Sequence, residues 1–235
     1  MSKKFYAQLH MHTAETSKCG RSGAADMIRA CKDAGYSLVA VTDHFFNGNI
    51  GCKPAPGEKP LPWEQQVEYL FRGYHAAKAE GDRIGVEVLQ AWETYTKGPE
   101  LLTYGLGEDF LLANPDIVEL DYYAYIKRVT DAGGLIIHAH PYRRMPYLIP
   151  FTPDPNSLEA YEVYNHSDTP NNPHFNHQAR AEAEAHNLLM FAGSDAHTTD
   201  GVRGGAMCFD DSVHSMSEIF QAMREGRGRI VEYME

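Results

Sequence analysis

Short apolar runs alternate along the chain with segments whose apolar residues recur at helical spacing. The runs predict strands at residues 5–9, 38–41, 84–88, 135–137, 160–163, 188–192 and 230–233. The helical spacing predicts helices at residues 24–34, 121–132, 179–186 and 217–224, and the first of these stops at Gly35. Because strands that alternate with helices pair in parallel, the pattern predicts an α/β fold.

Two segments interrupt this alternation. Residues 47–62 are rich in Gly and Pro, and prolines recur throughout residues 141–155. Both segments are predicted to be long loops. Long ordered loops in compact domains are often functional, so both are candidates to border a binding site.

Polar residues follow the ends of several predicted strands. His10 and His12 come after Leu9, His44 comes after Val41, and two further groups follow in the same way: His138 with His140, and Asp195 with His197. In barrels of alternating strands and helices, the active site is assembled at the C-terminal ends of the strands. The repeated position therefore predicts that these side chains meet in one site.

The spacing within these groups indicates metal binding. Residues i and i+2 of a strand point the same way, so His10 and His12 can direct two imidazoles at one point, and Asp195 and His197 can do the same. A mixture of imidazole and carboxylate suits Zn, Fe or Mn. No cysteine directly accompanies these groups, so a thiolate-rich structural zinc site is not expected.

Composition narrows the classes of partner. The 235-residue chain has a formal net charge of −11, which disfavours nucleic acid and anionic membranes because both attract clustered Lys and Arg. The four cysteines form no CxxC pair, and no apolar run approaches the ~18 residues that span a bilayer. The N-terminal residues lack the apolar stretch of a signal peptide. We therefore expect a cytoplasmic protein with reduced thiols and one domain over residues 1–235.

The motifs resemble those of the polymerase and histidinol phosphatase (PHP) family over most of the chain. The matching segments, in order, are Leu9-His10-Met11-His12-Thr13, Val41-Thr42-Asp43-His44, Gly85-Val86-Glu87-Val88, Ala139-His140-Pro141 and Gly193-Ser194-Asp195-Ala196-His197. The resemblance implies a distorted (β/α)7 TIM-like barrel. It also implies two or three divalent metal ions in the mouth of the barrel and hydrolysis of phosphoesters.

The same resemblance assigns the ligands residue by residue. It implies metal binding by His10, His12, His44, Glu87, His140, Asp195 and His197. Glu87 matches the bridging carboxylate, and Asp43 is expected to orient a neighbouring histidine. Residues 12–20 resemble one branch of free-standing members in which Glu15 would be a further ligand. Many members have another histidine near residues 102–105, where this chain offers only Glu100 nearby, so a third ion is in doubt.

Catalysis and substrate binding are assigned on the same basis. Glu87, Asp195 and His140 are the expected catalytic residues. Arg143 and Arg203 are expected to hold the phosphate of a small phosphorylated substrate, because the guanidinium fork matches phosphate oxygens. His138 is a candidate for contact with the substrate or with a metal ligand.

Two other functions stay open. An amidohydrolase-type barrel that cleaves C–N bonds also begins with an HxH motif, although the TDH and DxH motifs argue against it. A non-catalytic metal-binding domain is the second alternative, and the near-complete ligand set argues against it. The sequence names neither the phosphoester, nor the native metal, nor the oligomeric state.

Overall fold

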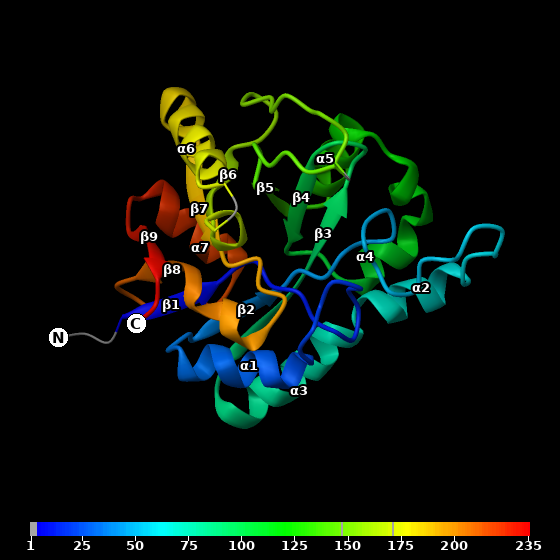
Figure 1. Cartoon of the computed structure of the whole chain (residues 1–235), viewed down its shortest axis with the longest axis horizontal. Coiled ribbons are helices and arrows are strands. Elements are labelled where there is room, and N and C mark those ends of the chain that lie inside the picture. Colours follow the sequence, from blue (N-terminus) through cyan, green and yellow to red (C-terminus); the bar gives the residue numbers. More distant parts are fainter. Residues whose placement is uncertain (1–3, 147, 171) are drawn as a thin grey trace.

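A mixed sheet that curls into a barrel forms the centre of the molecule (Figure 1). The computed structural model describes residues 4–146, 148–170 and 172–235. Within these residues the sheet has nine strands, in the order β7-β6-β5-β4-β3-β2-β1-β8-β9. The strands are β1 (Phe5–Gln8), β2 (Leu38–Val41), β3 (Glu87–Tyr95), β4 (Glu100–Tyr104), β5 (Leu135–Ala139), β6 (Ala160–Asn165), β7 (Leu189–Gly193), β8 (Gly204–Phe209) and β9 (Gly228–Tyr233).

The pairing of the strands corrects the expectation of a parallel (β/α)7 barrel. β1, β2 and β3 pair in parallel, as do β5, β6 and β7. β4 is antiparallel to both β3 and β5, and β8 is antiparallel to both β1 and β9. The α/β class is confirmed, but only short turns join β3 to β4, so these neighbours form a hairpin and not a crossover.

Helices cover the outside of the barrel. They are α1 (Ala24–Asp33), α2 (Trp63–Leu70), α3 (Arg72–Ile84), α4 (Glu108–Ala113), α5 (Tyr122–Asp131), α6 (His174–His186) and α7 (Met216–Arg224). Side-chain caps start two of them: Asp121 accepts from the amide of Ala124, and Ser215 accepts from the amide of Glu218. Such caps satisfy amides that have no partner within the helix.

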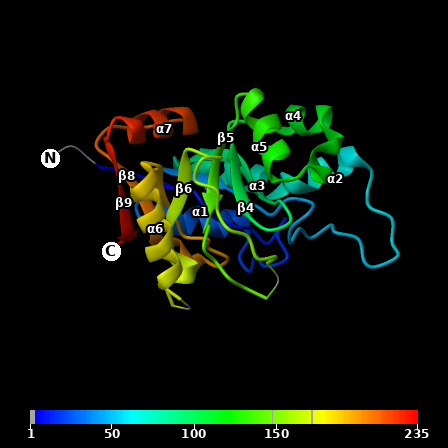
Figure 2. The same cartoon turned by 90° about the horizontal axis from the view of Figure 1, so that it is seen from above.

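Alternation along the strands divides the apolar residues between the interior and the helices. In β2, Leu38 and Ala40 join the interior cluster, whereas Val39 and Val41 pack with α1 and α3. Ile219 and Phe220 of α7 also belong to the interior cluster, so α7 covers one end of the barrel, as Figure 2 shows from above. The opposite end, where the parallel strands finish, is left for polar side chains.

Chain segments just beyond the strands close the barrel at that end. The amide of Asp195 donates to the carbonyl of His10, and Met11 forms a parallel bridge with Ala196. His44 and Glu93 form a similar bridge beyond β2. The ends of β1 and β7 are therefore joined by hydrogen bonds even though these strands are not neighbours in the sheet.

The sequence pattern was least accurate around β3. Residues 84–88 were expected to be a whole strand, but α3 continues to Ile84 and β3 runs from Glu87 to Tyr95. Residues 47–62 form a long loop, as expected, which projects from the body in both views (Figures 1 and 2). The described part of residues 141–155 also lacks helix and strand. None of the described helices has the length and apolar character needed to cross a membrane.

Candidate metal centre

Six of the eight expected metal ligands meet at the C-terminal ends of the parallel strands. These are His10 and His12 after β1, His44 after β2, His140 after β5, and Asp195 and His197 after β7. Both His10 and His12 are fully buried. The positional argument from the sequence therefore located this cluster correctly, although the metal-binding role of its members stays a prediction.

Glu93 is the carboxylate at the centre of the cluster. Its Oε1 lies 3.1 Å from His140 Nε2 and 3.4 Å from His10 Nε2. Its Oε2 lies 2.9 Å from His44 Nδ1 and 3.5 Å from His12 Nε2. One buried carboxylate thus contacts four imidazoles that come from three other strand ends.

Glu93 occupies the place that sequence analysis gave to Glu87. The Glu87 side chain is 36% exposed and pairs with His214 at 2.7 Å, and it belongs to none of the candidate ligand groups in the described residues. The two glutamates are six residues apart, so they point to the same face of β3 but sit roughly 20 Å apart along it. The expected bridging and catalytic role of Glu87 is wrong for this reason. The signal missed was the apolar alternation that continues through Ala91 and Trp92.

Asp195 joins the two ends of the site. Its Oδ1 lies 3.1 Å from His12 Nε2 and 3.5 Å from His10 Nε2, and its Oδ2 accepts a hydrogen bond of 2.8 Å from Arg143. Asp195 and His140 both have positive φ, 53° and 28°. This backbone conformation is uncommon outside glycine, and such strain is concentrated at functional sites.

Glu162, which sequence analysis did not consider, orients two of these residues from β6. Its Oε1 lies 2.9 Å from His10 Nδ1, and its Oε2 accepts from the amide of His140 at 2.9 Å. A carboxylate on one ring nitrogen fixes the tautomer and directs the other nitrogen at a ligand. Because His10 Nδ1 is engaged by Glu162, its Nε2 faces Glu93 and Asp195.

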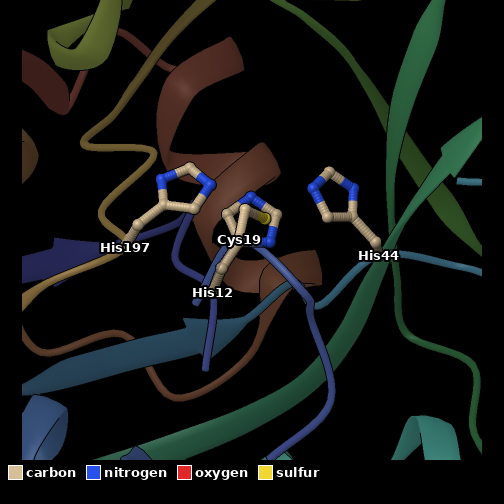
Figure 3. Close-up of side chains that lie close together, drawn as sticks. All are labelled: His12, Cys19, His44 and His197. Atoms are coloured by element: carbon tan, nitrogen blue, oxygen red, sulfur yellow. The ribbon is translucent and has the colours of Figure 1, made fainter. Parts of the chain in front are cut away.

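Cys19 and three imidazoles form a second part of the cluster (Figure 3). The rings of His12 and His44 stack at 4.4 Å between centroids, and those of His12 and His197 at 4.6 Å. Ligand atoms of these histidines and the thiol of Cys19 all lie within 4.8 Å of one another. The expectation that no cysteine accompanies the histidines is therefore corrected, because the loop after β1 folds back over the site.

Charge within the cluster holds its members in distinct protonation states. Burial disfavours the charged form of Glu93, but His10 and His44 outweigh it and hold its pKa well below the ordinary value. The pKa of Asp195 is also held well below its usual range, because His10 and Arg143 outweigh the effect of burial. Burial and the neighbouring His44 lower the pKa of His12 to about 3, so that ring is neutral at physiological pH and able to act as a ligand.

Two expected site residues lie elsewhere. Both carboxylate oxygens of Glu15 accept from the amide of Ala24, at 3.0 and 2.9 Å, and so bind the start of α1. Arg203 donates to the backbone carbonyl of Glu235 at 3.0 Å, and its own carbonyl accepts from the amide of Met234. These contacts tie Arg203 to the C-terminus, so neither a ligand role for Glu15 nor a phosphate role for Arg203 fits the structure.

His138 points away from the cluster. It lies on β5, where Ile137 and Ala139 face the interior, and its ring instead packs against Tyr122, Phe151 and Tyr161. The expectation that His138 and His140 would point the same way fails because the positive φ of His140 breaks the alternation. Among the described residues His138 Nδ1 has no hydrogen-bond partner.

Two cavities open beside the cluster. One, of about 610 Å³, is bordered by Cys19, His44, Glu93, Asp195 and His197 together with loop residues. The other, of about 320 Å³, is bordered by His140 and much of the loop after β5. Glu100 and Arg143 line both. Arg143 is held there by Asp168 at 2.7 Å, Asn165 at 3.0 Å and Asp195.

The donors in this cluster fit divalent metal ions. The described residues contain four overlapping groups of three or four His, Cys, Asp or Glu whose ligand atoms lie within 4.8 Å of one another. Buried carboxylates and imidazoles are costly unless they are paired or hold a metal. A mixed nitrogen and oxygen set of this kind suits Zn, Fe or Mn, and Glu100 joins it with His44 and Glu93.

Comparisons with known proteins agree with this fold. A family model described as PHP-associated matches residues 173–227, which run from just before α6 to just past α7. No curated protein matches the chain in sequence. The structure is similar to that of a two-domain protein from Bacteroides vulgatus containing a predicted PHP-like metal-dependent phosphoesterase, with a TM-score of 0.69 and 14% identity. The similarity covers 99% of this chain but only 66% of that one.

Two other solved structures are similar over nearly their whole length. A proposed metal-dependent phosphoesterase from Bifidobacterium adolescentis has a TM-score of 0.57 and 13% identity, covering 92% of this chain and 94% of its own. An amidohydrolase from Chromobacterium violaceum has a TM-score of 0.52 and 13% identity, covering 96% and 97%. At such low identity these likenesses concern the fold. Together with the matched family model and the order of the HxH, TDH and DxH motifs along the barrel, they identify this chain as a PHP family protein.

Proposed function

We propose that this protein is a metal-dependent hydrolase that cleaves a phosphoester of a small molecule. The observation that carries the proposal is the buried Glu93 carboxylate, which contacts the imidazoles of His10, His12, His44 and His140 beside an open cavity. A carboxylate in this position can bridge two ions. Such paired sites are typical of enzymes that displace a group at phosphorus.

Each residue has a distinct part in this proposal. His10, His12, His140, Glu93 and Asp195 would hold divalent ions. Bound ions would lower the pKa of a coordinated water toward ~7 and so supply hydroxide at neutral pH. Glu162 keeps His10 Nε2 directed at the ions by occupying its Nδ1. This second contact matters because ligand orientation tunes metal affinity.

The larger cavity suits a small phosphorylated substrate. Its volume of about 610 Å³ lies within the usual range for small-molecule sites, roughly 300–1,000 Å³. Lys53 and Arg143 bring positive charge to its wall, while Tyr95 and Phe175 offer aromatic surface. We propose that the cations attract the phosphate and that the aromatic rings pack against the organic group of the substrate.

A substrate panel tests the proposal. The full chain, expressed in metal-replete medium, is assayed against an aryl phosphate, nucleoside monophosphates, a phosphodiester, a lactam and a linear amide. We expect hydrolysis of a phosphoester class that is lost on chelation and restored by Zn, Mn or Fe. Metal-loaded protein that cleaves no phosphoester would contradict the proposal.

The same panel addresses the amidohydrolase alternative. One observation favours it, namely the shared barrel of the amidohydrolase described above. Cleavage of the lactam or the amide, with every phosphoester left intact, would replace the phosphoesterase proposal. Bound metal without turnover of any compound would instead favour a non-catalytic metal-binding domain.

A further inference from the structure

The thiol of Cys19 lies inside a group of imidazoles and not among apolar residues. Figure 3 shows its sulfur between His44 and His197, with His12 behind it. The thiol lines the larger cavity together with His44 and His197. All four ligand atoms lie within 4.8 Å of one another, which is the arrangement of donors around a single tetrahedral ion.

Hydrogen bonds fix the loop that carries Cys19. The amide of Lys18 donates to the carbonyl of Asn49 at 2.9 Å, and the amide of Arg21 donates to the carbonyl of His197 at 2.8 Å. The backbone is therefore held on both sides of the cysteine, once by the loop after β2 and once by the other end of the site. A thiol held in this way needs little rearrangement to bind an ion.

Asp43 holds the same loop from beneath. Its carboxylate accepts from the amide and the hydroxyl of Thr13, at 2.7 and 2.6 Å, and from the hydroxyl of Ser17 at 2.6 Å. The amide of His44 donates to the Ser17 hydroxyl at 3.0 Å. Asp43 thus acts on the loop and not directly on a histidine ring, and it fixes the Cys19 loop relative to His44.

The other three cysteines have different surroundings. Cys31 is buried in the apolar cluster between α1 and the sheet, where its thiol contacts Met11. Cys208 is buried within β8, and Cys52 is partly exposed on the loop after β2. All four cysteines are described by the structure, and Cys19 is the one grouped with histidines.

We propose that Cys19 binds a metal ion as a thiolate, together with His44 and His197. The inference rests on the proposed metal-dependent function and adds a second kind of centre to it. The thiol loses its proton to solvent when the ion binds, and the sulfur donates an electron pair to the ion. Because thiolate and imidazole favour Zn over Mn, whereas carboxylates suit Mn, the two parts of the cluster differ in metal preference.

Cobalt binding tests the inference without any turnover. Metal-free full-length protein is titrated with Co²⁺, and the near-ultraviolet band that arises from charge transfer between thiolate and cobalt is recorded. We expect the band in wild type, its loss on addition of Zn²⁺, and no loss on addition of Mn²⁺. Cys19→Ser should lack the band and bind about one ion fewer, since one tetrahedral site loses a donor. Cys52→Ser, the matched control, should retain both properties.

The outcomes separate this inference from the function on which it rests. Wild type that binds cobalt without the band, or Cys19→Ser that retains the band, would overturn the role of Cys19 while leaving the metal-dependent function in place. Wild type that binds neither Co²⁺ nor Zn²⁺ would overturn both. The wild-type spectrum alone decides the matter if Cys19→Ser fails to fold, which circular dichroism would reveal.

Discussion

The two glutamates of β3 differ in position and not in chemistry. Both point to the same face of the strand, but Glu93 is buried among imidazoles, whereas Glu87 pairs with the exposed His214. A carboxylate removed from water interacts more strongly with its neighbours than one at the surface. Glu93 and Glu87 therefore form a matched pair for testing which carboxylate the site uses.

Exchanging each carboxylate for its amide should separate them. We expect Glu93→Gln to lower hydrolysis by about 10² or more and to reduce bound metal, since one preorganised electrostatic group is lost. Glu87→Gln should retain wild-type metal content and rate. Steady-state kinetics and elemental analysis on the same preparations provide the measurement. Equal behaviour of the two variants would contradict the assignment of Glu93.

Arg143 and Arg203 offer a second pair. Arg143 contacts Asp195 and Asp168 beside the cavities, whereas Arg203 binds the C-terminal backbone. Loss of a charge-assisted contact costs ~1.5–3 kcal/mol, so we expect Arg143→Ala to lower kcat/KM by roughly 10–100-fold, and Arg203→Ala to leave it within about twofold of wild type. If Arg203→Ala were impaired as strongly as Arg143→Ala, the cavity would not be the substrate site.

Sequence reasoning found histidines better than carboxylates. His10, His12, His44, His140 and His197 stand out because histidine directly after a strand is uncommon, and all of them join the cluster. Glutamates are frequent on exposed strand positions, so nothing local distinguishes Glu93 or Glu162 from Glu87. Only the extent of β3 and the curl of the sheet determine which glutamates are buried.

At the scale of elements, the loop between β1 and α1 connects the two parts of the cluster. It passes from His12 over the site and returns at Gly20, which lies so close to Thr13 that an added Cβ would collide with the Thr13 carbonyl. Glycine is the residue that permits such an approach between two backbone segments. The position of Cys19 therefore depends on the absence of a side chain next to it.

We expect Gly20→Ala to disturb this loop. The new methyl group forces the backbone of Thr13 or Gly20 to shift, which should lower the free energy of unfolding by roughly 1–3 kcal/mol and weaken thiolate-to-cobalt absorption. Gly23→Ala is the matched control, because its added Cβ would meet only the flexible end of Glu15. Chemical denaturation and the cobalt spectrum measure the two effects. A stable Gly20→Ala with a wild-type spectrum would refute the close approach.

Elements with clear boundaries were predicted well from the sequence. β2 and the helices α1, α5 and α7 are confirmed to within a few residues, because glycines, caps or charged residues bound each of them. β8 was missed, since Gly204 and Gly205 disguise its start. The turn from α3 into β3 was misplaced because Val86 and Val88 are apolar at both helical and strand spacing.

The whole molecule assembles the site from strand ends that are distant in sequence. Ligands follow β1, β2, β5 and β7, and Glu93 lies within β3. A bound ion would therefore connect segments that the sheet itself joins by few hydrogen bonds, above all β1 and β7. Ligands that bind only the folded state raise its stability in proportion to their occupancy.

Metal should accordingly raise the melting temperature. Zinc at about 100 times its dissociation constant adds ~2.7 kcal/mol, and each kcal/mol shifts Tm by roughly 2–4 °C in a chain of this size. We expect chelated protein to melt several degrees lower and zinc to restore the loss. Asp195→Ala should respond less, whereas His214→Ala, altered at the exposed pair, should respond fully. Identical Tm values with and without zinc would contradict the prediction.

The positive φ of His140 and Asp195 has a consequence for directed evolution. Each such residue costs of the order of 1–3 kcal/mol, which glycine would not incur at the same backbone angles. A library of variants ranked by heat resistance alone should therefore enrich glycine at these two positions and lose the donors they carry. Stability and function compete there, so an improved catalyst must be selected by turnover and heat resistance together.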